Sequence, residues 1–323
     1  MNIDQQLVTD AIVGLDIGGP AKEEAARLIE GWLEHLDTFP ETKWKCLFVE
    51  TPFYIQLEPK TYVVGQMDAG FQDEQGVVLG EWKSRRAPKL KKDGTAWAGD
   101  DEDGWLADIS NGPQLGVYAL AGREGIFIHQ DGHKFTFRVP VPEMAPVIPF
   151  NMSEPRILVR AAVKSNPVVT WPGDYKKGLF TFPGPLLDSV RSALLSEAAS
   201  IRARRQRGVV PFMLPGTHCT NMYHRLCEHY KLCTERLTPP LEPKGWHPTD
   251  PGFEVARRLL GLDFLDPELV VLSASSLESW YWCAEKGRID YDGHGPREES
   301  FELSVGTGLH KGLASIYSQW ASK

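Results

Sequence analysis

The chain has 323 residues, 42% of them hydrophobic and 24% charged, which is the composition of a globular protein with one large domain or two smaller ones. No apolar run approaches the roughly 20 residues of a membrane-spanning helix, and the N-terminal stretch MNIDQQLVTD lacks the basic and apolar segments of a secretion signal, so we expect a cytoplasmic protein without membrane contact. The net charge of -8 excludes a protein that coats nucleic acid by overall positive charge, and any such contact must use local basic patches.

Helices and strands are predicted to alternate in the first half of the chain. Pro20 opens a helix, because apolar residues recur after it with the 3.6-residue period as far as Leu36. Strands are expected between turns that contain Pro, Gly or Asp, at 46–50, 53–57, 62–68 and 76–83. An acidic loop at 93–104 precedes a predicted helix at 113–122.

The same alternation continues to the end of the chain. Further strands are expected at 125–130, 134–141 and 156–164, and an amphipathic helix is expected at 186–207. A Pro-rich segment at 235–252 predicts a linker, and helices are expected after it near 254–265, 273–283 and 308–320. The pattern as a whole is typical of an α/β protein.

Two neighbouring predicted strands carry two acids and a lysine. The stretch GQMDAGFQDEQGVVLGEWKSRRAP, residues 65–88, holds Asp68 near the end of one strand and Glu81 and Lys83 near the end of the next. Carboxylates on adjacent strands can converge on one divalent ion, which prefers hard oxygen ligands. Lys83 points to the same face as Glu81, because strand side chains alternate, and it can there orient water or stabilise charge that develops on phosphorus. The pattern favours metal-assisted hydrolysis of a phosphodiester.

The predicted helix at 113–122 adds a second polar pair. Gln114 and Tyr118 lie one helical turn apart and therefore share a face. Their order and spacing after Lys83 favour a place beside the acidic hairpin. The alternative is that Tyr118 is a core aromatic and Gln114 a surface residue.

Four cysteines form a candidate cofactor site. Cys219, Cys227 and Cys233 lie within GTHCTNMYHRLCEHYKLC, and Cys283 follows in SASSLESWYWC. Thiolates bind iron–sulfur clusters or zinc, and four of them complete a site. Zinc stays open as an alternative because three histidines lie among these cysteines: His218, His224 and His229. A third reading is unrelated free thiols, and no disulfide framework is expected because no secretion signal is recognised.

These motifs together resemble the PD-(D/E)XK nuclease superfamily, in the RecB-like branch that includes CRISPR-associated exonucleases and many iron–sulfur phage nucleases. The resemblance implies a restriction-endonuclease-like fold, with a mixed central sheet flanked by helices and a cysteine-cluster subdomain. It implies that Asp68 and Glu81 hold Mn²⁺ or Mg²⁺, and that Lys83, Gln114 and Tyr118 act beside them on the DNA. The cofactor that it implies is a 4Fe-4S cluster, bound by the four cysteines Cys219, Cys227, Cys233 and Cys283.

The order of the motifs departs from that family. In its members, a segment like 273–283 begins the domain, and a helix like GTGLH, residues 306–310, precedes the acid and lysine hairpin. Placing residues 271–323 in front of residue 1 gives the family's order, so we expect a circular permutation in which His310 becomes a third metal ligand. Its imidazole favours manganese over magnesium. The alternative is that the segment begins a second nuclease copy.

The expected organisation is a nuclease core at 1–235, a Pro-rich linker and helix at 236–270, and the permuted segment at 271–323. Cys46 lies in an apolar strand and is expected to be a buried core thiol. Glu50, at the end of a strand before the hairpin, either hydrogen-bonds in the site or is exposed.

The expected activity is that of a DNA nuclease, an exonuclease on single-stranded DNA or DNA ends, in recombination, repair or phage DNA processing. Its expected partners are DNA and a helicase or recombinase, and its place is the bacterial host cytoplasm if a phage encodes it. The alternative is a non-catalytic nucleic-acid-binding module with a structural cysteine–metal site. The joint presence of Asp68, Glu81 and Lys83 favours the enzyme, because a module without catalysis has no chemical need for all three.

Overall fold

The structure of the chain is a computed structural model, and it describes residues 4–15, 17–34, 39–86, 91–94, 102–128, 132–137, 154–164, 169–170, 178–207, 260–262, 266, 268–274, 277 and 301–321. The helices among these residues are α1 (Gln5–Val13), α2 (Gly19–Glu34), the 3-10 helix η2 (Pro40–Lys43), α3 (Glu102–Asn111), α4 (Pro113–Glu124), α6 (Gly184–Arg207) and α11 (Phe301–Ala321). The strands are β1 (Lys45–Glu58), β2 (Thr61–Asp73), β3 (Gly76–Arg86), β4 (Ile126–Ile128), β5 (Lys134–Phe135), β6 (Arg156–Lys164), β7 (Val169–Thr170), β8 (Leu179–Thr181) and β9 (Val270–Leu272).

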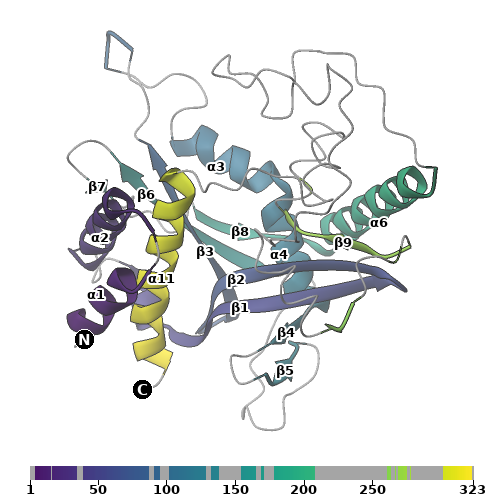
Figure 1. Ribbon diagram of the computed structural model, residues 1–323, viewed down its shortest axis with the longest axis horizontal. Coiled ribbons are helices and arrows are strands. Elements are labelled where there is room, and N and C mark those ends of the chain that lie inside the picture. Colours follow the sequence, from purple (N-terminus) through teal and green to yellow (C-terminus); the bar gives the residue numbers. More distant parts are fainter. Residues whose placement is uncertain are drawn as a thin grey trace. The chain divides into compact units, whose positions relative to one another are not determined.

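The strands form one mixed sheet. Its order is β5-β4-β1-β2-β3-β6-β7, with β8 paired to β6 and β9 paired to β2. Strands β2 and β3 are antiparallel, and β3 and β6 are parallel, so that Trp82 lies opposite Arg160. Helices flank this sheet (Figure 1). The α/β class with a central mixed sheet is therefore confirmed.

The chain divides into two compact units. The first contains Met1–Phe53, Gln66–Asp188 and Glu299–Lys323, and the second contains Tyr54–Gly65 and Ser189–Glu298. Residues 301–321 thus belong to the same unit as Asp68 and Glu81. The expected boundary between 270 and 271 lies inside β9, and that between 235 and 236 lies outside the described residues.

Within the second unit, the ends of β1 and β2 contact α6 and β9. Strand β9 pairs in parallel with the start of β2, from Thr61 to Val63. Arg202 of α6 donates to the Thr61 hydroxyl at 2.6 Å, to the Glu58 carboxylate at 3.2 Å and to the backbone carbonyl of Glu268 at 3.1 Å. Arg202 is therefore engaged within the protein.

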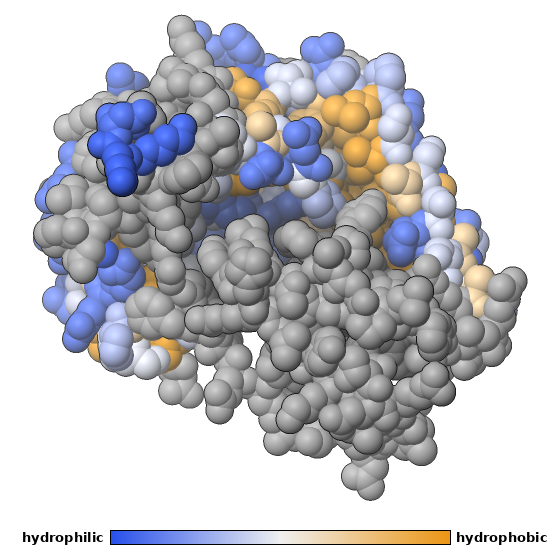
Figure 2. Space-filling view, turned by 90° about the horizontal axis from the view of Figure 1, so that it is seen from above, coloured by the Kyte–Doolittle hydropathy of each residue, from blue (hydrophilic) through white to orange (hydrophobic). Residues whose placement is uncertain are grey.

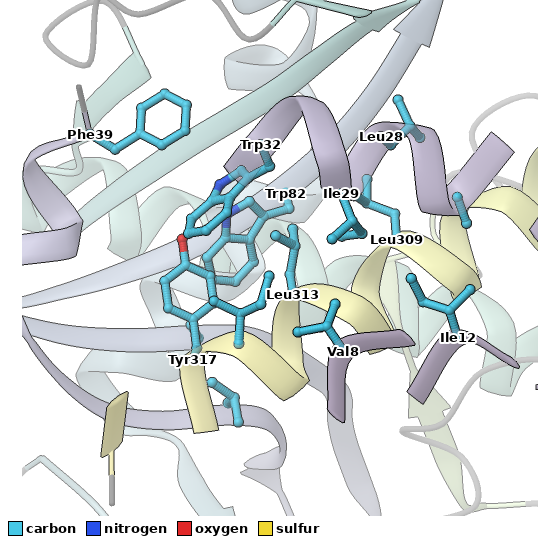
Figure 3. Packing of buried hydrophobic residues seen from close by; sticks show 14 of the residues in the cluster. Val8, Ile12, Leu28, Ile29, Trp32, Phe39, Trp82, Leu309, Leu313 and Tyr317 are labelled. Atoms are coloured by element: carbon cyan, nitrogen blue, oxygen red, sulfur yellow. The ribbon is translucent and has the colours of Figure 1, made fainter. Parts of the chain in front are cut away.

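In the first unit, helices α1, α2 and α11 share a hydrophobic core with β3. Figure 3 shows the Trp82 ring of β3 beside Tyr317 of α11 and Trp32 of α2. The Trp82 and Tyr317 ring centroids are 5.0 Å apart, and those of Trp32 and Tyr317 are 5.5 Å apart. The side chains of Glu81 and Lys83 leave the strand on the opposite face from Trp82 because strand residues alternate. The aromatic core therefore anchors the strand from behind.

Two glycines let α11 lie close to α2. A Cβ atom added at Gly308 would lie 2.5 Å from the Cβ of Ala25, and one added at Gly312 would lie 2.7 Å from Cγ1 of Ile29. Ordinary side chains at these two positions would push the helices apart. His310 lies between the two glycines in the sequence, so this close packing sets the position of its backbone.

The described helices include none with the length and apolar character that crossing a membrane requires. Figure 2 shows one face of the molecule, on which hydrophobic residues lie among hydrophilic ones. The large hydrophobic side chains that are exposed in the described part of the chain are Leu7, Val13 and Leu186.

Candidate functional site

The β2–β3 hairpin holds Asp68 and Glu81 in the interior. Asp68 is 5% exposed and Glu81 is 1% exposed, although both are carboxylic acids. The β2–β3 ladder runs from Asp73–Gly76 to the pair Ala69–Gly80. Beyond that pair, the Trp82 backbone N–H donates to Oδ2 of Asp68 at 2.7 Å. The acid thus continues the connection between the strands where their backbone pairing ends.

Gln114 of helix α4 forms hydrogen bonds with both Glu81 and Lys83. The Nζ atom of Lys83 forms an ion pair with Oε1 of Glu81 and donates to Oε1 of Gln114 at 2.8 Å. The Gln114 amide nitrogen donates to Oε1 of Glu81 at 2.7 Å and to the Tyr118 hydroxyl at 3.0 Å. The structure therefore brings Glu81 and Lys83 of the hairpin together with Gln114 and Tyr118 of the helix expected at 113–122.

Helix α11 brings His310 to the other acid of the hairpin. The Nδ1 atom of His310 lies 3.3 Å from Oδ1 of Asp68 and 3.5 Å from Oε1 of Glu50. Its Nε2 atom lies 3.1 Å from the backbone carbonyl oxygen of Trp82. A carbonyl can only accept a hydrogen bond, so Nε2 carries the proton of that bond. The Nδ1 atom is then the one that faces the acids.

Glu50 belongs to this site through an unusual backbone conformation. It lies in the middle of β1 with a φ of 43°, in the left-handed region that a residue with a side chain seldom adopts. Pro52 follows two residues later, and the strand continues to Glu58, so the two strands expected at 46–50 and 53–57 are one. The irregular backbone aims the carboxylate at His310 and Asp68, a placement that the sequence left open.

One residue of the site was not expected from the sequence. The amide nitrogen of Gln66 donates to Oε2 of Glu50, and the Gln66 carbonyl oxygen accepts from the Tyr118 hydroxyl at 2.8 Å. Gln66 precedes Asp68 by two positions in β2, so both side chains lie on the same face of the sheet. The two-residue alternation of side chains along a strand was the signal in the sequence that could have identified Gln66.

Burial and neighbouring charges shift the pKa of both acids of the hairpin. Burial, followed by repulsion from Asp68, raises the pKa of Glu81 to about 7, although Lys83 lowers it in part. Burial also raises the pKa of Asp68, but the charges of His310 and Lys83 and the hydrogen bonds from His310 and the Trp82 backbone lower it by more, so that it lies below its ordinary value. Three carboxylates thus crowd a small, largely buried volume, and they are stabilised by positive charge.

The arrangement fits a divalent metal ion. The ligand atoms of Glu50, Asp68 and His310 all lie within 4.8 Å of one another. Two hard oxygen donors with one imidazole suit Mn²⁺ or a similar ion, and a ligand histidine commonly donates its other ring N–H to a backbone carbonyl, as His310 does. In addition, Oε2 of Glu81 is buried and has no hydrogen-bond partner in the described structure, as a ligand oxygen would be without its ion.

The candidate cofactor cysteines lie outside the described residues. These are Cys219, Cys227, Cys233 and Cys283, with the neighbouring histidines His218, His224 and His229. Cys46 is described, and it is a free thiol that is 4% exposed. Burial raises its pKa to about 12, although a hydrogen bond with the Phe48 backbone lowers it in part, so this thiol is a core residue.

Comparison of the chain with protein-family models, with curated proteins and with solved structures gave no match in any of the three. The sheet and the site define the chain as a mixed α/β protein with an acid and histidine cluster that can hold a metal ion.

Proposed function

We propose that this chain is a metal-dependent DNA nuclease of the PD-(D/E)XK superfamily, in its RecB-like branch, and that it acts as an exonuclease on single-stranded DNA or DNA ends. Its sheet would then be the restriction-endonuclease-like core of that superfamily. The antiparallel β2–β3 hairpin next to a parallel β6, with α4 beside the hairpin residues, supports this assignment.

One observation carries the proposal. Lys83 forms an ion pair with the almost completely buried Glu81. On the neighbouring strand β2, Asp68 contacts His310 of helix α11. A purely structural ion pair would gain little from burying Glu81, which is 1% exposed, because removing a charge from water costs several kcal/mol. Catalytic sites commonly contain such buried, perturbed groups.

The residues divide the chemistry between them. Asp68, Glu50 and His310 would hold the ion. Oε2 of Glu81, which is buried without a hydrogen-bond partner in the described structure, would be a further ligand. A divalent ion bound there would polarise a phosphoryl oxygen and lower the pKa of a water molecule. Lys83 would orient the attacking water and stabilise the negative charge that develops on the phosphorus oxygens.

Gln114 and Tyr118 would hold the side chains of Lys83 and Glu81 in position. Gln114 accepts from Lys83 through its oxygen and donates to Glu81 through its nitrogen, so its amide orientation follows from its two partners. Tyr118 is 6% exposed and packs edge-on against Phe53, with ring centroids 5.8 Å apart. Loss of either residue would leave the lysine and the acid free to rotate out of the reactive geometry.

We further propose that Cys219, Cys227, Cys233 and Cys283 bind a 4Fe-4S cluster, with zinc as the alternative. Four thiolates support it, since they suit either cofactor. Anaerobic purification is expected to give a brown protein with broad visible absorbance. A colourless protein with stoichiometric zinc would contradict the cluster and favour zinc.

The activity is tested with end-labelled single-stranded and double-stranded DNA of the same sequence. We expect degradation with Mn²⁺, weaker degradation with Mg²⁺, and none with a chelator, because hard oxygen ligands with one imidazole prefer manganese. The labelled products give the polarity of cutting. If the folded protein retains its cofactor and binds DNA yet leaves every substrate intact with either metal, the chain is a nucleic-acid-binding module and the proposal is wrong.

A further inference from the structure

Gln66 connects the two halves of the site. One half consists of Glu81, Lys83 and the α4 residues, and the other consists of Glu50, Asp68 and His310. The side chain of Gln66 bonds to Glu50, while its backbone carbonyl accepts from Tyr118 at 2.8 Å. Gln66 is half-buried in β2, two positions before Asp68.

The hydrogen bonds through Gln66 run in one direction. Lys83 donates to the Gln114 oxygen, the Gln114 nitrogen donates to the Tyr118 hydroxyl, and that hydroxyl donates to the Gln66 carbonyl. The Gln66 amide then donates to Oε2 of Glu50. Each group in this series uses a donor toward the next one, so no amide can be flipped without losing a bond.

The backbone of Glu50 departs from ordinary strand geometry, so the direction of its carboxylate depends on a side-chain donor such as Gln66. Its φ of 43° lies in the left-handed region, which costs free energy for a residue with a side chain. The bond from Gln66 engages Oε2 and leaves Oε1 facing His310 and Asp68. Without the donor, the carboxylate can rotate and either oxygen can turn away from the cluster.

We propose that Gln66 is a positioning residue that sets the metal affinity of the site by fixing Glu50. The inference rests on the proposed function insofar as the cluster binds a divalent ion. Outer-shell partners of metal ligands typically change metal affinity by about 10- to 100-fold when they are removed. Gln66 acts on a ligand carboxylate in the same way.

The test is a titration of the full-length protein with Mn²⁺, in which electron paramagnetic resonance measures the bound and free ion. Manganese is the suitable probe because the thiolates of the cysteine set prefer softer metals. Gln66→Met keeps the size of the side chain and removes the donor, and we expect it to weaken Mn²⁺ binding by about 10-fold. Gln72→Met is the matched control, because Gln72 lies on the same strand and the same face but outside the site.

A mutant cycle shows whether Gln66 acts through Glu50. Glu50→Gln weakens Mn²⁺ binding itself and keeps an amide oxygen as a ligand, so binding stays measurable at higher Mn²⁺ concentrations. In that background, Gln66→Met should change the affinity by no more than about twofold, because the carboxylate it positions is gone. The metal-free unfolding midpoint of each variant shows that the loss in affinity is not a loss of fold.

The outcomes separate this inference from the proposed function. If the wild type binds Mn²⁺ and Gln66→Met binds it equally well, the role of Gln66 is wrong and the metal site stands. An equal loss in the Glu50→Gln background also contradicts the inference, because Gln66 would then act elsewhere. If the wild type binds no Mn²⁺ at all, both the metal site and the inference are wrong.

Discussion

The Nε2 atom of His310 lies 3.1 Å from the carbonyl oxygen of Trp82, although 228 positions separate the two residues in the chain. The same residue also binds one acid of the cluster, because the Trp82 N–H donates to Asp68 at 2.7 Å. The Trp82 ring on the other face packs against Tyr317 of the helix that carries His310. One residue thus fixes the distance between strand β3 and helix α11 where the metal would bind.

The first prediction concerns the metal preference. His310→Ala removes the nitrogen donor, so Mn²⁺ affinity should fall by more than the ~10-fold typical of outer-shell changes, and Mg²⁺ affinity should fall less. Competition between the two ions, read by the Mn²⁺ signal, measures both. His133→Ala is the control, because His133 is exposed and far from the cluster residues in the sequence. An unchanged Mn²⁺ preference would remove His310 from the ligand set.

The second prediction concerns the packing of α11. Gly308→Ala places a methyl group 2.5 Å from the Cβ of Ala25 and should destabilise the protein by about 1–3 kcal/mol. Gly306→Ala has no atom within 4 Å of the new methyl group and should instead gain up to about 1 kcal/mol of helix propensity. Urea unfolding of the pair measures the difference. Equal stabilities would mean that α11 does not pack closely on α2.

The third prediction concerns Cys46. Because its pKa is about 12, only about one thiol in ten thousand is ionised near pH 8, and the thiolate is the reactive form. Iodoacetamide should leave Cys46 unmodified in the native protein and alkylate it in denaturant, as peptide mapping by mass spectrometry shows. Rapid labelling of native Cys46 would mean that this strand is open to solvent.

The fourth prediction concerns acid stability. Arg156 donates to both oxygens of Asp73, at 2.7 and 2.8 Å. Burial raises the pKa of Asp73, but these bonds and the Arg156 charge lower it by more, so that the folded-state pKa lies below the unfolded one. Stability from the pair is therefore fully present above about pH 4 and is lost as the pH falls through the folded-state pKa.

Asp73→Asn tests that pair. The variant should be less stable than the wild type by about 1 kcal/mol at neutral pH, and the difference should shrink as the pH falls below about 4. Unfolding free energies at several pH values measure both curves. A difference that grows in acid would reverse the sign of the argument.

Local patterns in the sequence were sufficient to identify the hairpin and the polar pair of α4. Alternation along the strand placed Glu81 and Lys83 on one face of β3, and helical spacing placed Gln114 and Tyr118 on one face of α4. Both periods follow from the backbone alone. The expected helix at 113–122 is α4, and the expected helix at 308–320 lies within α11. Helix α1 was not expected, and α3 begins inside the expected acidic loop.

The remaining parts of the site depend on tertiary structure. The positive φ of Glu50 has no sequence signal of its own, since Glu is not a residue that prefers that region. The binding of His310 by the Trp82 carbonyl is invisible in a sequence because every residue has such a carbonyl. The motif order of the nuclease superfamily that the sequence resembles suggested that His310 belongs near Asp68, but the contact itself depends on the packing of α11.

The most direct test of the nuclease proposal compares Lys83→Ala with Lys45→Ala under single-turnover conditions with Mn²⁺ and end-labelled DNA. Lys45 is an exposed lysine at the start of β1 and serves as the matched control. We predict that Lys83→Ala binds DNA and Mn²⁺ but cuts about 100-fold or more slowly, because it has lost a group that stabilises developing charge, while Lys45→Ala cuts like the wild type. Equal cutting rates for wild type and Lys83→Ala would place the activity elsewhere and contradict the account.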